Sequence, residues 1–368
     1  MKIIAVFGTR PEAIKMCPLI LELKKNQSIE CIVCLTGQHR EMLRQVMNAF
    51  NIVEDYNLNI MRDRQTLTTI TTRILGKLEP VLQKEKPDVV LVHGDTTTSF
   101  AAALAAFYQK IPVGHVEAGL RTGNVYSPYP EEMNRLLTGR IATYHFAPTE
   151  RNKSNLKLEN ITENVYVTGN TVIDSFMTTV IEGYHFKDET LCKLDFINRR
   201  VITVTAHRRE NLGEPLQNIC KAIKKIAQEY MDIDFVYPVH LNPIVRSMVY
   251  SMLENIENVK LIEPLDVLDM HNLISRSYMI MTDSGGLQEE APALGKPVLV
   301  LRTETERPEA AEAGTVKVVG VCEQDIYYEA KRLLDDSKAY DAMAHAVNPY
   351  GDGHASERIV EILLRELA

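Results

Sequence analysis

The chain lacks the features that would place it in a membrane or on nucleic acid. No apolar run approaches the roughly 20 residues that a membrane-spanning helix needs. The amino-terminal stretch MKIIAVFGTRPEA turns polar too early for a signal peptide. Basic residues are not in excess, because 41 Lys and Arg stand against 49 Asp and Glu, which gives a net charge of −8. We therefore expect neither a membrane nor a nucleic-acid partner.

Cysteine is sparse, and the common cofactor fingerprints are missing. The six cysteines are scattered, and the one close pair, Cys31 and Cys34, lies in the apolar run IECIVCL, which indicates a buried strand. A redox or metal role for that pair is disfavoured. The sequence contains neither the GxGxxG dinucleotide fingerprint nor a GxxxxGK[ST] phosphate loop. We expect a cytoplasmic protein with reduced thiols and no cofactor.

What is present is a repeated alternation of short apolar runs and amphipathic stretches. At 368 residues the chain is too long for one typical hydrophobic core, so two domains are expected. The runs predict two series of buried strands, at residues 3–7, 29–35, 89–92, 112–116, 144–147 and 165–167, and then at 201–205, 235–237, 259–262, 279–281, 298–301 and 316–319. Continuous apolar strands that alternate with helices predict parallel sheets covered on both faces.

The predicted architecture is therefore α/β, with two Rossmann-like, doubly wound domains. The boundary falls best near residue 170, where the sequence turns irregular and charged. This gives an amino-terminal domain of residues 1–170 and a carboxy-terminal domain of residues 171–354, followed by an amphipathic helix at 355–368. Ligands bind at the carboxyl ends of such strands, so an active site is expected in a cleft between the domains.

Four motifs in the first half follow predicted strands. GTRPEAIK (8–15) joins a glycine turn to a helix that begins near Pro11, and with Arg10 and Lys15 it is typical of an anion site. HGDTTT (93–98), HVEAGLR (115–121) and PYPEEMNR (128–135) deliver three carboxylates, which are Asp95, Glu117 and Glu131. Converging carboxylates indicate proton chemistry, metal binding or pairing with arginine. The His93/Asp95 and His115/Glu117 pairs leave a dinuclear metal hydrolase open as an alternative.

The second half supplies groups suited to a phosphate ester. TAHRREN (205–211) puts His207 and Arg208 at a strand end, and PVHLNP (238–243) adds His240 there. TDSGGLQEEAP (282–292) opens a helix after a Ser284-Gly285-Gly286 turn, whose bare N–H groups can meet phosphate. Glu290, one turn further, is placed to accept hydrogen bonds from ribose hydroxyls. TERPE (305–309) places Arg307 after the next strand.

These ordered motifs together resemble the non-hydrolysing UDP-N-acetylglucosamine 2-epimerases. The resemblance runs from residue 2 to about residue 358, and the intact RPEAIK stretch favours the non-hydrolysing over the hydrolysing branch. It implies the glycosyltransferase-B-type fold, with the last helix crossing back onto the amino-terminal domain. It also implies a homodimer without metal or cofactor that interconverts UDP-GlcNAc and UDP-ManNAc for surface polysaccharides.

The resemblance assigns roles by motif. The catalytic positions are Asp95, Glu117, Glu131 and His207. The substrate-binding positions are Arg10, Lys15, Asp95, Glu117, His207, His240, Leu265, Met270, Ser284, Gly285, Gly286, Glu290 and Arg307. In the uracil-facing segment, some members have glutamine at position 265 and an aromatic residue at 270. The residues that match an allosteric UDP-GlcNAc site of some bacterial members are Gln38, His39, Arg64, Glu131 and Arg208.

The chemistry of the sugar is compatible with this assignment. The C2 hydrogen has no adjacent carbonyl and is not acidic, but departure of UDP from C1 would acidify it. A carboxylate could then remove the proton to leave 2-acetamidoglucal, and protonation from the other face with return of UDP gives the manno epimer. The alternatives are a glycosyltransferase of the same fold, a non-catalytic nucleotide-sugar sensor and the metal hydrolase.

Overall fold

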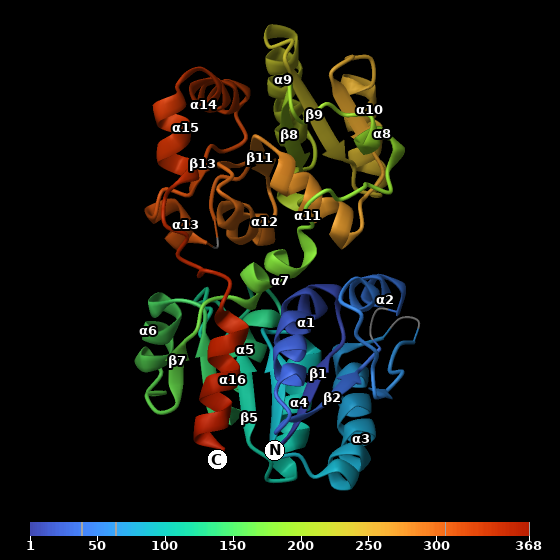
Figure 1. The fold of residues 1–368 in the computed structure, drawn as a ribbon, viewed down its shortest axis with the longest axis vertical. Helices are drawn as coiled ribbons and strands as arrows, with labels where there is room; N and C mark the ends of the chain where they lie inside the picture. Colours follow the sequence, from blue (N-terminus) through green and yellow to red (C-terminus); the bar gives the residue numbers. More distant parts are fainter. Residues whose placement is uncertain (38–39, 63–64, 306, 368) are drawn as a thin grey trace. The chain divides into compact units, whose positions relative to one another are not determined.

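The computed structural model describes residues 1–37, 40–62, 65–305 and 307–367. The chain forms two compact units (Figure 1). Unit 1 consists of Met1–Thr178 and Tyr350–Ala368, and unit 2 consists of the intervening segment, Thr179–Pro349. The chain therefore passes from one unit to the other twice. Each unit is a parallel sheet with helices on both faces, which confirms the predicted pair of doubly wound α/β domains.

Unit 1 is built on a seven-stranded parallel sheet of order β3-β2-β1-β4-β5-β6-β7. Its strands are β1 (Lys2–Phe7), β2 (Glu30–Leu35), β3 (Tyr56–Asn57), β4 (Val89–His93), β5 (Val113–Val116), β6 (Tyr144–Ala147) and β7 (Val165–Val167). Its helices are α1 (Arg10–Lys25), α2 (Arg40–Ala49), α3 (Leu67–Glu85), α4 (Thr97–Tyr108), α5 (Glu131–Ile141), α6 (Glu150–Leu158), α7 (Thr171–Thr179), which ends at the unit boundary, and α16 (Ala355–Glu366).

Local sequence explains how β1 leads into α1. Residues 3–7 are apolar and fully buried between the helical layers. Thr9 then caps α1 by accepting the N–H of Glu12, whose side chain in turn accepts the N–H of Thr9. Pro11 occupies the first turn, where a missing N–H costs no helical hydrogen bond. The capped start of α1 fixes the backbone positions of Arg10 and Lys15.

The last helix belongs to unit 1. α16 lies beside α1 (Figure 1), and its amphipathic sequence buries Ile359 and Leu363 completely. The buried carboxylate of Asp174 accepts the N–H groups of Ala355 (3.2 Å) and Ser356 (2.6 Å) at its start. These contacts satisfy donors that the first helical turn leaves unpaired. Burial raises the pKa of Asp174, although the Ser356 N–H opposes that shift.

Unit 2 carries a six-stranded parallel sheet of order β10-β9-β8-β11-β12-β13. Its strands are β8 (Arg200–Thr205), β9 (Ile233–Pro238), β10 (Val259–Ile262), β11 (Met279–Thr282), β12 (Val298–Val300) and β13 (Val316–Val318). The helices are α8 (Glu189–Cys192), α9 (Glu214–Glu229), α10 (Pro243–Leu253), α11 (Val267–Arg276), α12 (Gly285–Glu290), α13 (Pro308–Glu312), α14 (Glu323–Asp335) and α15 (Ser337–Ala344), with short 3₁₀ turns at Arg209–Asn211 and Ala291–Leu294.

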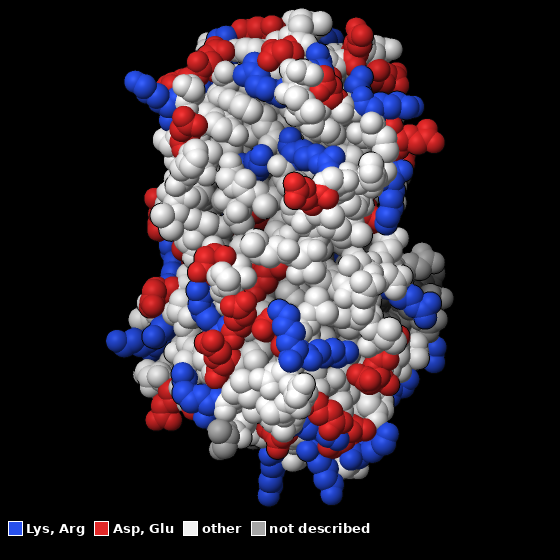
Figure 2. Space-filling model, viewed as in Figure 1, with Lys and Arg blue, Asp and Glu red and all other residues white. Residues whose placement is uncertain are grey.

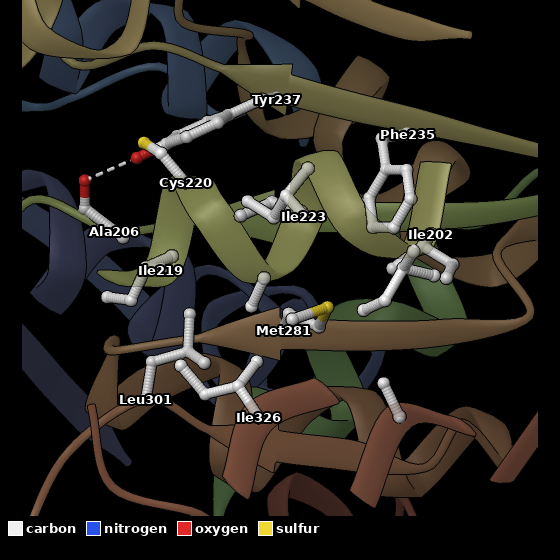
Figure 3. Packing of buried hydrophobic residues seen from close by; sticks show 14 of the residues in the cluster. Ile202, Ala206, Ile219, Cys220, Ile223, Phe235, Tyr237, Met281, Leu301 and Ile326 are labelled. Atoms are coloured by element: carbon white, nitrogen blue, oxygen red, sulfur yellow. Dashed lines mark hydrogen bonds between the residues drawn. The ribbon is translucent and has the colours of Figure 1, made fainter. Parts of the chain in front are cut away.

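The core of unit 2 fixes the strand ends that carry polar residues. Figure 3 shows Ile219 and Ile223 of α9 packed over Ile202 and Met281 from two neighbouring strands. Burying an aliphatic side chain of this kind contributes about 1.5–3 kcal/mol. The one polar contact drawn there is the Tyr237 hydroxyl, which donates to the carbonyl of Ala206 at 2.8 Å. It ties the end of β9 to the end of β8.

Both sheets reverse their winding at one point. In unit 1 this point lies between β1 and β4, and in unit 2 between β8 and β11. Loops leave such neighbouring strands in opposite directions, so a ligand can enter between them. Among the described residues, no helix is long and apolar enough to cross a membrane. On the face seen in Figure 2, basic and acidic side chains are interspersed.

Candidate active site

The carboxyl ends of β1, β4 and β5 bring the predicted residues of unit 1 together. These strands are adjacent and in register, with Ala5 opposite Leu91 and Leu91 opposite Gly114. The loops after them therefore start at one edge of the sheet. Gly94, which precedes Asp95, lies beside Glu117, because a Cβ atom added to that glycine would stand 3.7 Å from Glu117 Oε1.

Glu117 is the centre of a buried polar cluster. Its Oε2 atom forms an ion pair with Lys15 Nζ and accepts a hydrogen bond from Asn170 Nδ2 at 3.0 Å. His93 Nε2 lies 3.7 Å from the same oxygen. The side chains of Lys15 and Glu117 are only 12% and 10% exposed, so water screens their charges weakly.

The backbone of Glu117 is in a conformation that side chains seldom adopt. Its φ is 64°, in the left-handed region that favours glycine. Such a residue costs about 1–3 kcal/mol and persists only where its surroundings impose it. The side chain of this residue forms the ion pair with Lys15 of α1, so the unusual backbone conformation occurs at the centre of the polar cluster.

Asp95 is held by an arginine of α5. Arg135 Nε donates to Asp95 Oδ2 at 2.9 Å, and Nη2 lies 2.7 Å from the same oxygen in the ion pair. Arg135 Nη1 donates to Glu132 Oε2 at 2.9 Å. Asn134 Nδ2 donates to the Asp95 carbonyl at 2.9 Å. Glu132 in turn accepts the N–H of Thr122 at 3.0 Å. The planar guanidinium thus links two carboxylates in a fixed geometry.

The other predicted residues of unit 1 lie at helix starts. Glu131 is the first residue of α5 and is half-buried, while Arg10 is the first residue of α1 and is also half-buried. No hydrogen bond or ion pair joins either side chain to the residues that the structure describes. A carboxylate at a helix N-terminus is stabilised by the helix dipole.

A buried carboxylate that the sequence analysis did not single out connects two of these loops. Glu12 Oε2 accepts the N–H groups of Gly8 (2.9 Å) and Thr9 (2.7 Å), and Oε1 accepts the hydroxyls of Thr96 (2.5 Å) and Ser99 (3.0 Å). It joins the loop that follows β1 to the start of α4. Burial raises the pKa of Glu12, although the Thr96 hydroxyl opposes that shift.

Three histidines lie in the adjacent strands β4, β5 and β6 of unit 1. His115 and His145 are opposite each other in β5 and β6, and His93 ends β4. Burial lowers their pKa values to about 4 for His93, about 3 for His115 and about 4 for His145. They are therefore neutral near pH 7. His115 Nε2 donates to the Gly94 carbonyl at 2.7 Å, which holds the peptide that precedes Asp95.

In unit 2, the ends of β8 and β9 bring two predicted histidines together. The rings of His207 and His240 stack with centroids 4.8 Å apart and planes 20° apart. Both residues remain exposed to solvent. Partial removal of water from His207 lowers its pKa, while the charge of Asp283 raises it and His240 and Arg208 oppose that effect. The pKa of His207 therefore depends on the charges of the groups around it.

The glycine turn after β11 lies close to this histidine pair. A Cβ atom on Gly285 would stand 3.6 Å from Arg208 Nη2, which is an ordinary van der Waals distance. A Cβ on Gly286 would stand 3.1 Å from Glu290 Oε1. The predicted residues of the TDSGG motif and of the TAHRR motif are thus neighbours in space. Small residues there leave backbone N–H groups accessible to an anion.

Arg307 is fixed by a carboxylate that the sequence analysis had not assigned to it. Its Nε atom forms an ion pair with buried Glu289, and its N–H donates to Thr305 Oγ1 at 3.0 Å. Thr305 donates to Gln288 Oε1. The loop after β12 is thereby attached to α12, close to Glu290. The neighbouring Glu290, predicted to contact ribose, is half-buried.

The segment expected to face uracil begins helix α11. Leu265 and Met270 are half-buried at this position. Between them, Asp266 caps the helix, and buried Asp269 accepts the hydroxyl of Tyr184 at 2.8 Å. The two aspartates therefore hold the segment in place. Gln38, His39 and Arg64 lie outside the described residues.

The described residues contain no group of three or more His, Cys, Asp or Glu side chains arranged to hold a metal ion. Instead, Asp95 and Glu117 pair with Arg135 and Lys15. Sequence reasoning missed Arg135, Asn170 and Asp283 as partners of the predicted residues. Arg135 and Asp283 do lie inside the PYPEEMNR and TDSGG motifs. The motifs therefore included these two residues but did not indicate which side chains they would contact.

Comparison with known proteins gives consistent matches. The family model described as UDP-N-acetylglucosamine 2-epimerase matches residues 21–364. The UDP-N-acetylglucosamine 2-epimerase of Bacillus subtilis is 57% identical over 366 residues, which cover 99% of this chain and 95% of the relative.

The chain is also similar to solved structures of UDP-GlcNAc 2-epimerases over nearly its whole length. The UDP-GlcNAc 2-epimerase of Neisseria meningitidis bound to UDP-GlcNAc is 55% identical, with a TM-score of 0.88 and coverage of 99% of this chain and 100% of that one. A Staphylococcus aureus protein, MnaA, solved with UDP, is 50% identical, with a TM-score of 0.89 and coverage of 100% and 97%.

Proposed function

The chain belongs to the UDP-N-acetylglucosamine 2-epimerase family, and from that premise we propose that it interconverts UDP-GlcNAc and UDP-ManNAc by eliminating and re-adding UDP. The single observation that carries the chemical part of the proposal is the pair of fixed, partly buried carboxylates at one sheet edge, Asp95 with Arg135 and Glu117 with Lys15. These are acid and base groups in a setting without a metal-ligand cluster among the described residues.

Elimination of UDP makes the C2 hydrogen of the sugar acidic enough to be removed. The C2 hydrogen of the sugar cannot be removed directly, because no neighbouring carbonyl would stabilise the carbanion. When the C1–O bond to UDP breaks, its electrons leave with the diphosphate, and positive charge develops at C1. A carboxylate then takes the C2 proton, and the C–H electrons form the C1=C2 double bond of 2-acetamidoglucal. Protonation of C2 on the opposite face and return of UDP to C1 give the epimer.

We assign proton transfer to the unit 1 carboxylates. Glu117 is fixed by Lys15 and Asn170, and Asp95 is fixed by Arg135. Held carboxylates lose little orientation entropy when they react. Glu131, the first residue of α5, is the third acid or base group, as the family resemblance implies. The ammonium group of Lys15 balances the negative charge of Glu117.

We assign the leaving group to the residues of unit 2. The Ser284-Gly285-Gly286 turn, Arg208 and His207 supply N–H donors and positive charge to the diphosphate, whose charge increases as the C1–O bond breaks. Arg307 and Glu290 then complete the nucleotide site, as the family resemblance implies.

Three further properties follow from the family resemblance and are part of the proposal. The enzyme works as a homodimer, its product supplies surface polysaccharides, and UDP-GlcNAc at a second site speeds turnover of UDP-ManNAc. The second-site residues include Glu131 and Arg208, with the rest outside the described residues. Purified UDP-ManNAc should react slowly until traces of UDP-GlcNAc are added. Light scattering tests the dimer.

One assay tests the main activity. Purified protein and UDP-GlcNAc alone, after EDTA treatment and without NAD, are followed by proton NMR. We expect a second anomeric signal, that of UDP-ManNAc, to grow to a constant ratio. Dependence on a divalent ion would favour the metal hydrolase, and loss of sugar to an added acceptor with C2 untouched would favour a glycosyltransferase.

A further inference from the structure

A buried aspartate joins the loops of unit 2 that carry the substrate-binding residues. Asp283 is completely buried at the end of β11. Its Oδ2 atom accepts the N–H of His207 (2.8 Å), the N–H of Arg208 (2.7 Å) and the side-chain amide of Asn211 (2.9 Å). The same Asn211 amide donates to the Leu301 carbonyl at 3.0 Å. One carboxylate thus connects the ends of β8, β11 and β12.

The turn that contains His207 is held from its other side as well. The Tyr237 hydroxyl donates to the Ala206 carbonyl at 2.8 Å (Figure 3). Asp283 accepts from the next two N–H groups. Three successive backbone positions therefore have fixed partners, although the His207 side chain itself is exposed. Asp283 also directly precedes the Ser284-Gly285-Gly286 turn, so it fixes the distance between the two motifs.

A neutral residue could accept the same hydrogen bonds at lower cost. Burying a carboxylate costs several kcal/mol that its hydrogen bonds only partly offset. The charge of Asp283 acts on the His207 ring. The other groups that face this ring are Arg208 beside it and His240 stacked on it, and both disfavour a second positive charge. Among these three neighbours of the His207 ring, Asp283 is the one that carries a negative charge.

We propose that Asp283 is a positioning residue, which fixes the His207-Arg208 turn against the Ser284-Gly285-Gly286 turn and places a buried negative charge beside His207, Arg208 and His240. This inference rests on the proposed function in one respect only, that His207 serves the departing diphosphate. The charge effect itself is a property of the free protein. It can therefore be measured without substrate.

The experiment is an NMR titration of the histidine rings in the free protein. The chain has ten histidines, and the spectrum of a His207→Gln variant assigns the resonance of His207. Asp283→Asn keeps the shape of the side chain and removes its charge. It should move the His207 midpoint to lower pH and reduce kcat/KM for UDP-GlcNAc by roughly 10- to 100-fold, which is the size of effect that misplaced groups cause.

Asn211→Ala is the matched control, because it removes one hydrogen bond to Asp283 and leaves the charge. Its His207 midpoint should stay at the wild-type value. An unchanged midpoint in folded Asp283→Asn, or an equal shift in Asn211→Ala, would overturn the proposal.

Asp283→Ser provides a second test if Asp283→Asn does not fold, and it should show the same downward shift. Unfolding of both variants would assign Asp283 to the fold and also overturn the proposal. A wild-type protein that does not epimerise UDP-GlcNAc would instead refute the proposed function, while the titration would still decide the role of Asp283.

Discussion

Lys15 and Glu117 form a buried ion pair that connects the first turns of α1 with the end of β5, 102 residues further along the chain. The pair restrains a carboxylate whose backbone is already in the left-handed region. Removing one partner leaves an uncompensated buried charge, whereas removing both leaves a neutral pair. Stability and activity can therefore be separated at this site.

Glu117→Gln should reduce the turnover number by roughly 10²–10⁴-fold, the usual contribution of a positioned acid or base. It should also lower the melting temperature, because Lys15 loses its partner. The double variant Lys15→Met/Glu117→Gln should recover stability and remain inactive. Calorimetry and the NMR assay measure the two effects. Glu163→Gln, at an exposed position, is the control and should change neither. Wild-type turnover in Glu117→Gln would remove this residue from the chemistry.

Arg135→Lys should lower the turnover number about tenfold or more, because one ammonium group cannot serve Asp95 and Glu132 together as a planar guanidinium does. The melting temperature should fall as well, since the carboxylate of Glu132 is buried and would lose its guanidinium partner. Arg140→Lys changes an exposed residue of the same helix and serves as the control. Steady-state kinetics with UDP-GlcNAc give the result, and equal rates for the two variants would contradict this role of Arg135.

His145 should make the stability of the protein depend on pH. Burial lowers its pKa from 6.5 to about 4 in the folded chain. The unfolded chain therefore takes up the proton first, so this contribution to stability is complete above pH 6.5 and is lost as the pH falls toward 4. His145→Leu should remove about one proton, or about 1.4 kcal/mol per pH unit, from the slope of the unfolding free energy between pH 5 and 6.

Urea unfolding at several pH values measures that slope. Other groups with shifted pKa values, such as Glu12 and Asp174, are present in both proteins and cancel in the comparison. Equal slopes for wild type and His145→Leu would show that His145 binds its proton in the folded state as readily as in the unfolded state.

The sequence allowed the strands to be predicted because most are continuous apolar runs. The exception is β3, whose two residues, Tyr56 and Asn57, are too few to form a pattern. That the motifs would lie together was also predictable, because the carboxyl ends of parallel strands share one edge. The fold class and the order of motifs therefore followed from local patterns.

The pairing of side chains could not be predicted in the same way. Asp95 and Arg135 are 40 residues apart, and their contact depends on how α5 packs against the sheet. The left-handed conformation of Glu117 has no sequence signature, since the residue is not a glycine. Arg307 lies in the TERPE motif, but its ion pair with Glu289 depends on how the loop after β12 packs against α12.

The most direct test of the account is the fate of the C2 hydrogen. In the proposed elimination, the intermediate glycal takes its new proton from an enzyme group, and such groups exchange with solvent between turnovers. UDP-ManNAc formed from UDP-GlcNAc in D₂O should therefore carry deuterium at C2, seen by proton NMR as loss of the C2 signal and of its coupling to the anomeric proton. Product that keeps its original C2 hydrogen throughout would contradict elimination of UDP.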